Sequence, residues 1–208
     1  MSAIKVCGIK TAETYDLLLE LNVNWAGLVF YPPSPRYITL DQARQLPDYK
    51  NHGLLKVGLF VKPTLDDIAK VLDHVHLDIL QLYTSTQMIK TIRNHFGLPV
   101  WLAQGIRTVC DLPDNYDVDG LVIEAPSHQS DLHPGGNGRT FDWQLTSGWQ
   151  APRPWLLAGG LTPTNVTQAI KQSGARAVDV SSGVERQKGE KDHALIREFV
   201  GNINNFDF

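Results

Sequence analysis

Short apolar runs of strand length alternate along this chain with amphipathic segments of helix length, and little sequence is left for long linkers. The expected strands are residues 4–9, 25–30, 54–60, 79–83, 100–106, 120–125, 155–159 and 177–182. Eight strand and helix pairs in succession predict an α/β fold: a single (β/α)8 TIM barrel with eight parallel strands, formed by residues 1–208 as one domain.

Helix signals follow most of the strands. The expected helices are residues 11–21, 40–46, 64–73, 86–96, 163–174 and 191–203, with a weak, short helix after the fifth strand and a polar loop leading to 141–145 after the sixth. Thr39 is a predicted N-cap, and Thr64 followed by Asp67 resembles a capping box. Gly174 is expected to end its helix.

The loops after the last two strands distinguish this barrel from an open, doubly wound sheet. A doubly wound sheet places its glycine-rich phosphate loop after the first strand, where this chain has no GxGxxG. Instead, Gly159 and Gly160 follow the seventh strand, and Ser182 and Gly183 follow the eighth. Backbone N–H groups there are predicted to bind a phosphate. Ordinary turn chemistry explains the same residues equally well.

Composition narrows the class of function. The 208 residues carry a formal net charge of −3, and Lys and Arg are scattered, so neither nucleic acid nor an anionic membrane is an expected partner. Cys7 and Cys110 are the only cysteines, which argues against a disulfide framework and a structural zinc site. Without an apolar signal core or a run of about 18 apolar residues, the chain is expected in the cytoplasm.

Polar residues at alternate strand positions are candidates for chemistry, because residues two apart share one face. Predicted to face the barrel interior are Lys5 with Cys7, Gln81 with Tyr83, Asp179 with Ser181, and Glu124 with Val122. Predicted to face the helices are Val6, Leu80, Ile123 and Val180.

Cys7 and Glu124 each allow a structural and a chemical interpretation. Cys7 is compatible with a nucleophile, a general base or a small buried side chain, whereas Cys110 has no polar partners nearby in sequence. A carboxylate at position 124 is costly to bury unless it is paired or functional, and a structural ion pair is the alternative to catalysis. Lys5 is a candidate partner for Glu124, or a group that helps to set the protonation of Cys7.

Several motifs in order resemble the phosphoribosylanthranilate isomerase family of tryptophan biosynthesis. They are KVCGIK (5–10), GLVFYPPSPRYI (27–38), VGLFV (57–61), PGGNGRTFDW (134–143), LAGGLTPTNV (157–166) and VDVSSGVE (178–185). Each lies at the rim of its own expected strand or in the loop that follows, so the set is far more specific than one glycine-rich loop. The family is a (β/α)8 barrel that needs no cofactor and no metal.

The resemblance implies an Amadori rearrangement of N-(5-phosphoribosyl)anthranilate. Cys7 matches the family's base, and Glu124 falls at the position of its acid. A thiol titrates near 8.5, so Cys7 would need a favourable environment, for which Lys5 is a candidate; burial should raise the pKa of Glu124. Arg36 matches the residue that pairs with the anthranilate carboxylate, a solvated loop arginine being the alternative.

The resemblance also implies substrate contacts for Asp179 and for the loop of residues 126–140. Asp179 is expected to orient the ribose hydroxyls or the acid–base pair, with burial beside a structural partner as the alternative. Gly136 is a predicted substrate contact in the polar loop of residues 126–140, which is long enough to close as a lid, although its glycines also suit simple turns.

The sequence departs from the family at three places. Glu124 stands where the family usually has Asp; Tyr83 and Thr84 replace a His and a Gly; Leu102 replaces a frequent Lys of the fifth strand. These departures keep two alternatives open, a related phosphosugar isomerase or epimerase and a catalytically weak paralogue that binds phosphoribosyl metabolites. The expected partner is a small phosphorylated substrate, and the sequence leaves monomer and homodimer equally open.

Overall fold

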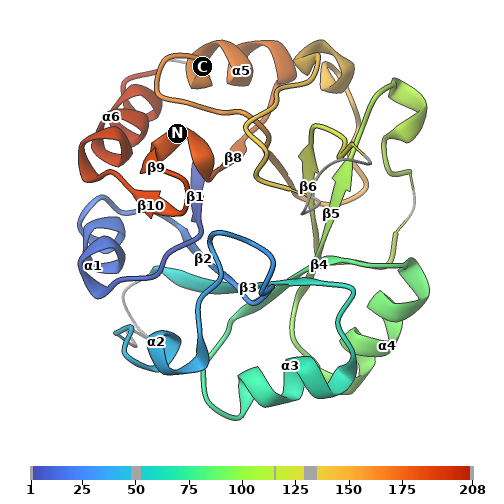
Figure 1. The fold of residues 1–208 in the computed structure, drawn as a ribbon. Helices are drawn as coiled ribbons and strands as arrows, with labels where there is room; N and C mark the ends of the chain where they lie inside the picture. Colours follow the sequence, from blue (N-terminus) through green and yellow to red (C-terminus); the bar gives the residue numbers. More distant parts are fainter. Residues whose placement is uncertain (1, 48–52, 115, 129–134, 207–208) are drawn as a thin grey trace.

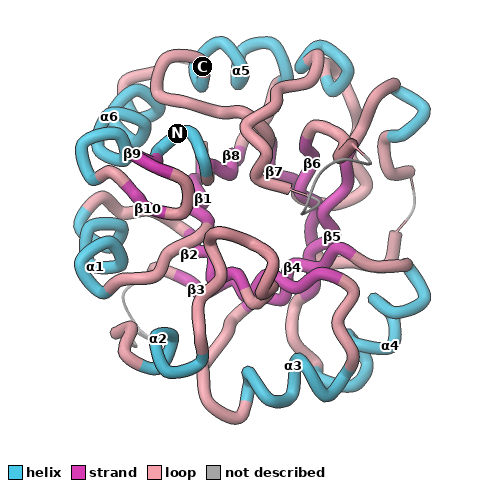
Figure 2. The backbone as a smooth tube through the Cα atoms, in the orientation of Figure 1, coloured by secondary structure: helices cyan, strands magenta, loops and turns pink. Residues whose placement is uncertain are grey.

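Eight parallel strands close into a barrel in the order β1 to β8 (Figures 1 and 2). The computed structural model describes residues 2–47, 53–114, 116–128 and 135–206. The strands are β1 Ala3–Cys7, β2 Trp25–Val29, β3 Leu55–Val61, β4 Ile79–Tyr83, β5 Val100–Gly105, β6 Gly120–Glu124, β7 Trp155–Leu157 and β8 Ala177–Val180. The predicted (β/α)8 barrel is therefore confirmed.

Helices lie around the outside of the barrel (Figure 2). The α-helices are α1 Ala12–Glu20, α2 Leu40–Arg44, α3 Leu65–Leu72, α4 Thr86–Phe96, α5 Val166–Ser173 and α6 His193–Asn204. Thr39 and Thr64 form the capping boxes that begin α2 and α3, with Gln42 and Asp67 as partners. Gly174 ends α5 in the left-handed conformation, with φ of +71°. The predicted helix boundaries are confirmed within a few residues.

The regular alternation breaks after β5 and β6, where the sequence signal for a helix is weak. Single turns of 3-10 helix stand there, η1 Val109–Asp111 and η2 Trp143–Thr146. The last unit also differs from the prediction, because β8 ends at Val180 and is followed by the 3-10 turn η3 Ser182–Val184. A two-stranded antiparallel hairpin, β9 Glu185–Gln187 and β10 Glu190–Lys191, comes next, and the alternation of polar residues did not predict it.

Strand alternation sorts the core into two layers. Val6, Leu80, Ile123 and Val180 pack with the helices outside the barrel, as predicted. Val122 belongs to a separate cluster inside it, with Val57, Ile79, Trp101, Ala103, Leu156 and Ala158. Trp101 meets Trp25 edge to face, with ring centroids 5.2 Å apart, and Gly120 leaves the room that the Trp101 ring occupies. The side chains of this inner cluster fill the interior below the strand ends, so the polar site lies above it.

The length and polarity of the helices decide whether any of them could span a membrane. Across the described ranges, every helix is too short or too polar to cross a lipid bilayer.

Candidate active site

A cavity opens at the carboxyl ends of the barrel strands. Its wall includes, in chain order, Cys7, Arg36, Gln81, Tyr83, Glu124, Gly135, Gly136, Gly159, Gly160, Asp179, Ser181 and Ser182. The structure therefore brings together the residues that the sequence singled out on six different strands and their loops. Gly183 and Lys5 are exceptions, because neither residue lines this cavity.

Gly183 has a packing reason to be glycine. A Cβ on this residue would collide with the carbonyl oxygen of Leu161, which belongs to the loop after β7. The loops after β7 and β8 therefore touch at this point, and only a residue without a side chain permits the approach. A backbone contact from Gly183 to a phosphate stays a prediction.

Cys7 ends β1 with its thiol buried at the cavity wall, 4% exposed. Gly27 on β2 makes room for it, since a Cβ there would lie 2.7 Å from Sγ. Burial raises the pKa of the Cys7 thiol above its usual value, and the nearby positive charges of Lys5 and Lys191 offset this only in part. Lys5 therefore acts on Cys7 in the expected direction, by lowering the thiol pKa, but burial outweighs this effect and the net shift of that pKa is upward.

Lys5 is held by Asp179, not by Glu124. The two residues stand opposite each other in the register of β1 and β8, and Lys5 Nζ donates a hydrogen bond of 2.8 Å to Asp179 Oδ2. Although burial lowers the pKa of Lys5, the attraction of Asp179 raises it above the usual value. This ion pair joins the first and last strands of the barrel, and Lys5 is also hydrogen-bonded to the side chain of Cys7.

Glu124, at the end of β6, is paired with Tyr83 at the end of β4. The Tyr83 hydroxyl donates a hydrogen bond to the Glu124 carboxyl group. Burial raises the pKa of Glu124 to about 8, although the Tyr83 hydrogen bond lowers it. Gly135 passes so close above the pair that a Cβ would lie 2.9 Å from Glu124 Oε2. The expected elevation of the Glu124 pKa is confirmed, so this carboxyl group carries a proton at pH 7.

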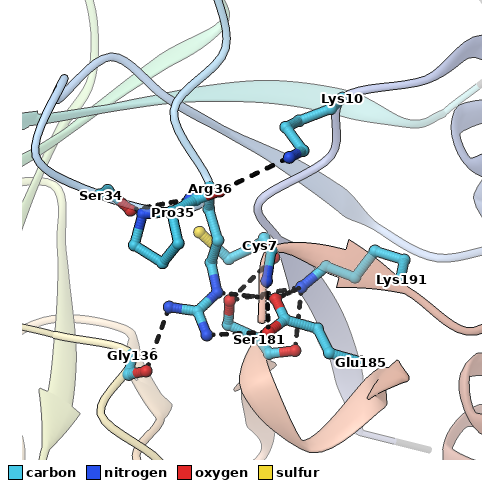
Figure 3. A network of polar contacts seen from close by, with 10 residues as sticks. Cys7, Lys10, Ser34, Pro35, Arg36, Gly136, Ser181, Glu185 and Lys191 are labelled. Carbon is cyan, nitrogen blue, oxygen red and sulfur yellow. Dashed lines mark hydrogen bonds and ion pairs between the residues drawn. The ribbon is translucent and has the colours of Figure 1, made fainter. Parts of the chain in front are cut away.

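Arg36 is fixed by a buried ionic network (Figure 3). Its Nε and one Nη donate bonds of 2.7 and 2.9 Å to the two carboxylate oxygens of Glu185, and the other Nη donates to the Gly136 carbonyl oxygen at 3.1 Å. Only 4% of Arg36 is exposed, so the alternative of a solvated loop arginine is wrong. Lys191 Nζ donates to Glu185 at 2.8 Å from the other side.

Sequence reasoning missed Glu185 and Lys191. Lys191 Nζ also donates to the carbonyl oxygen of Ser181 at 2.9 Å, and the Ser181 hydroxyl donates to the carbonyl oxygen of Cys7 at 3.0 Å. The β9–β10 hairpin thus delivers a buried ammonium group to the base of the loop after β8. Lys191 lies between two acidic residues, Glu190 and Asp192, a pattern typical of a solvated turn. No local feature of the sequence predicts that its side chain is buried.

The loops after β7 and β8 form the opposite part of the cavity wall. Gly159 and Gly160 adopt φ values of +86° and +62°, which an L side chain rarely allows. A Cβ on Gly138 would lie 3.5 Å from Ser182 Oγ, so the described end of the 126–140 loop reaches the same wall. Residues 129–134 of this predicted lid lie outside the described residues.

Neither Leu102 nor a metal-binding cluster of side chains contributes to the cavity in the described part of the chain. Leu102 packs in the outer core beside the helices, so its replacement of a lysine takes no charge from the cavity. Within the described ranges there is no group of three or more His, Cys, Asp or Glu side chains suited to hold a metal ion.

Comparison with known proteins gives a consistent result. Residues 4–202 match the family model described as N-(5'phosphoribosyl)anthranilate (PRA) isomerase. An N-(5'-phosphoribosyl)anthranilate isomerase from Acidiphilium cryptum is 44% identical over 201 residues, which cover 96% of this chain and 97% of that protein. The phosphoribosyl anthranilate isomerase crystal structure from Thermotoga maritima has a TM-score of 0.80 and 31% identity, covering 98% and 99% of the two chains.

A second solved structure that is similar to this chain contains a bound ligand. It is a phosphoribosyl anthranilate isomerase in complex with reduced 1-(o-carboxyphenylamino)-1-deoxyribulose 5-phosphate, and it aligns with a TM-score of 0.80 at 30% identity over 98% of this chain and 99% of that one.

Proposed function

This chain belongs to the N-(5'-phosphoribosyl)anthranilate isomerase family, and we propose that its Cys7 and Glu124 are the base and the acid of the isomerisation. The reaction converts N-(5'-phosphoribosyl)anthranilate into 1-(2-carboxyphenylamino)-1-deoxyribulose 5-phosphate, a step of tryptophan biosynthesis. The observation that carries the assignment is the placement of a buried thiol on β1 and a protonated carboxyl group on β6 in the wall of one cavity.

Glu124 performs the first proton transfer. Its proton passes to the ring oxygen of the ribose, the bond between C1′ and that oxygen breaks, and the anthranilate nitrogen lone pair forms the open-chain iminium. An acid with a pKa of about 8 keeps this proton at pH 7, yet is close enough in pKa to give it up.

Cys7 performs the second transfer as its thiolate. The thiolate removes the C2′ proton, the C–H electrons form the C1′=C2′ bond of an enolamine, and the iminium nitrogen regains its lone pair. Tautomerisation then moves a proton from the C2′ hydroxyl to C1′ and gives the ketone. Exchange with solvent returns a proton to Glu124 and removes one from Cys7.

The substrate carries a charged group at each end, and the cavity wall offers a partner for each. Arg36 is proposed to receive the anthranilate carboxylate through N–H groups other than those that hold Glu185, and Glu185 fixes the plane of the guanidinium. Gly159, Gly160, Ser182 and Gly183 are proposed to bind the phosphate through backbone N–H groups, and Gly136 to contact the substrate from above. Asp179 is proposed to orient the hydroxyls between these ends.

All of these groups come from a single chain, so a monomer and a homodimer would both hold complete sites. We place the enzyme with the other amino-acid biosynthetic reactions of the cytoplasm. The proposed chemistry uses proton transfers alone and therefore needs no cofactor.

The assignment is tested by following the fluorescence change of N-(5'-phosphoribosyl)anthranilate with purified protein and by growth of a tryptophan auxotroph that lacks the isomerase. The Glu124→Gln variant should turn over about 10²- to 10⁴-fold more slowly. Glu198→Gln, an exposed glutamate, is the matched control and should retain wild-type turnover. A well-folded wild-type protein without turnover would support the weakly active paralogue, and turnover of a different phosphosugar alone would support the related isomerase or epimerase.

A further inference from the structure

Two buried polar atoms in the cavity wall lack a hydrogen-bond partner. Within the described part of the chain, four buried side-chain atoms make no hydrogen bond: Ser2 Oγ, Gln81 Oε1, Trp143 Nε1 and Asp179 Oδ1. Gln81 and Asp179 line the cavity, whereas Ser2 and Trp143 do not. A buried acceptor without a donor is destabilising, so its retention at a cavity indicates that a ligand supplies the donor.

Gln81 is the unexplained member of this pair. It occupies the middle of β4, in register with Leu59 and Trp101, and only 1% of it is exposed. Its inward-facing neighbours on adjacent strands are mainly hydrophobic, and a leucine or methionine would fit such surroundings without an orphaned oxygen. Nothing in the acid–base chemistry derived above uses the Gln81 carboxamide.

The substrate's own groups limit what Gln81 can bind. At neutral pH the phosphate and the carboxylate offer almost only acceptors, so neither satisfies an orphaned acceptor. Hydroxyl groups and the arylamine N–H are the remaining donors. Because β4 and β8 lie four strands apart in a closed barrel of eight, Gln81 and Asp179 face the middle of the substrate from opposite sides.

We propose that the carboxamide of Gln81 is a positioning group that accepts a hydrogen bond from a hydroxyl of the sugar-derived chain. A second hydroxyl is then available to Asp179 Oδ1 on the opposite wall. Together the two contacts fix the rotation of the open chain between Cys7 and Glu124, so that C2′ faces the thiolate. The inference rests on the proposed function and adds a residue to it.

The first test replaces Gln81 by Met, which keeps the length of the side chain and removes its polar atoms. We expect kcat/KM to fall about tenfold, mostly through kcat, while the thermal midpoint of the unliganded protein stays constant or rises. Ser2→Ala is the matched control, because it removes another orphaned oxygen away from the cavity and should leave both kinetic constants unchanged. Gln81→Asn, which withdraws the carboxamide by one methylene, should show the same kinetic loss.

Two results would overturn the inference. One is a Gln81→Met enzyme with wild-type kcat/KM; the other is a lowered thermal midpoint in Gln81→Met, which would give Gln81 a structural role. Turnover by the wild type in the same assay separates these results from a failure of the proposed function, which would abolish wild-type activity as well.

Binding measurements identify the donor. Reduced 1-(o-carboxyphenylamino)-1-deoxyribulose 5-phosphate contains both the hydroxyls and the arylamine, whereas ribulose 5-phosphate contains the hydroxyls alone. We expect Gln81→Met to weaken both ligands by a similar factor in calorimetry. If Gln81→Met weakened the binding of the arylamino compound alone, the donor would be the amine N–H, and the proposed hydroxyl contact would be contradicted.

Discussion

The cavity wall has two chemically different ends: a backbone end at the loops after β7 and β8, and an acid–base end around Cys7 and Glu124. At the ends of β7 and β8 the wall is backbone, with Gly159 and Gly160 in conformations that exclude ordinary side chains. Around Cys7 and Glu124 it consists of buried side chains whose ionisation depends on neighbours from other strands. The first end is therefore suited to hold a fixed charge, and the second to move protons. Damage to the two ends should accordingly appear in different kinetic constants.

Replacement of Cys7 by Ser should have the largest effect on turnover. A serine hydroxyl is a far weaker acid than a thiol, so the base is lost while the shape is kept, and kcat should fall about 10²- to 10⁴-fold with little change in KM. Cys110→Ser, at an exposed cysteine, is the control and should behave as wild type in steady-state kinetics. A Cys7→Ser enzyme that retained more than a tenth of the turnover would remove Cys7 from the mechanism.

The pH dependence of kcat/KM tests the acid–base end of the cavity. The productive form pairs a Cys7 thiolate with a protonated Glu124, yet the thiol has the higher pKa, since burial raises it above its usual value while Glu124 titrates at about 8. Below pH 8 both groups are protonated, so kcat/KM should rise about tenfold per pH unit between pH 6 and 8 and level off above. A profile that is flat over this interval would contradict the assigned order of the two pKa values.

Glu185→Gln tests the network that holds Arg36. The substitution leaves the buried cations of Arg36 and Lys191 without their shared carboxylate, so we expect a loss of about 3 kcal/mol in the free energy of unfolding and a raised KM. Glu20→Gln is the matched control, because Glu20 accepts the same bidentate pair of bonds from Arg197 at the exposed surface. Chemical denaturation that gave equal losses for both variants would show that burial adds nothing to the Arg36 network.

The contrast also explains what the sequence could predict. Gly159, Gly160 and Ser182 are recognisable because turn chemistry is local, and the inward faces of β1, β4, β6 and β8 follow from alternation alone. Pairing is not local: Lys5 lies 174 residues from Asp179, and Arg36 lies 149 from Glu185. The sequence therefore places Lys5 inside the barrel but cannot choose its partner, because both Glu124 and Asp179 face that interior.

The missed hairpin has a related cause. Glu185–Lys191 contains no hydrophobic residue, so neither strand alternation nor amphipathic periodicity marks it. Its structure depends on contacts made elsewhere, because Glu185 and Lys191 are buried by Arg36 and Ser181. Conversely, the sequence predicts only a weak, short helix after β5 and a polar loop leading to 141–145 after β6, and the structure has a single 3-10 turn in each region.

Gly160→Ala should damage the backbone end of the cavity. At φ of +62° a Cβ would meet Thr140 Cγ2 at 2.6 Å, so we expect a loss of about 1–3 kcal/mol in stability and a KM raised roughly tenfold with kcat nearly unchanged. Gly97→Ala is the control, since Gly97 has φ of +65° with open space around it and lies at the end of α4. Gly97→Ala should lose stability without a change in KM. A loss of kcat in Gly160→Ala would contradict the separation of substrate binding and proton transfer between the two ends of the cavity.

The smallest effect is expected at Tyr83, which is hydrogen-bonded to Glu124 at the acid–base end of the cavity. Its hydrogen bond lowers the pKa of Glu124, so Tyr83→Phe should raise that pKa and move the pH at which kcat/KM stops rising to a value above 8. Turnover at pH 7 should fall only a few-fold, through the lost orientation of the carboxyl group. Glu124→Asp withdraws the carboxyl group from Tyr83, so adding Tyr83→Phe to it should cost nothing more. Additive losses in the double variant would show that the longer acid does not depend on this tyrosine.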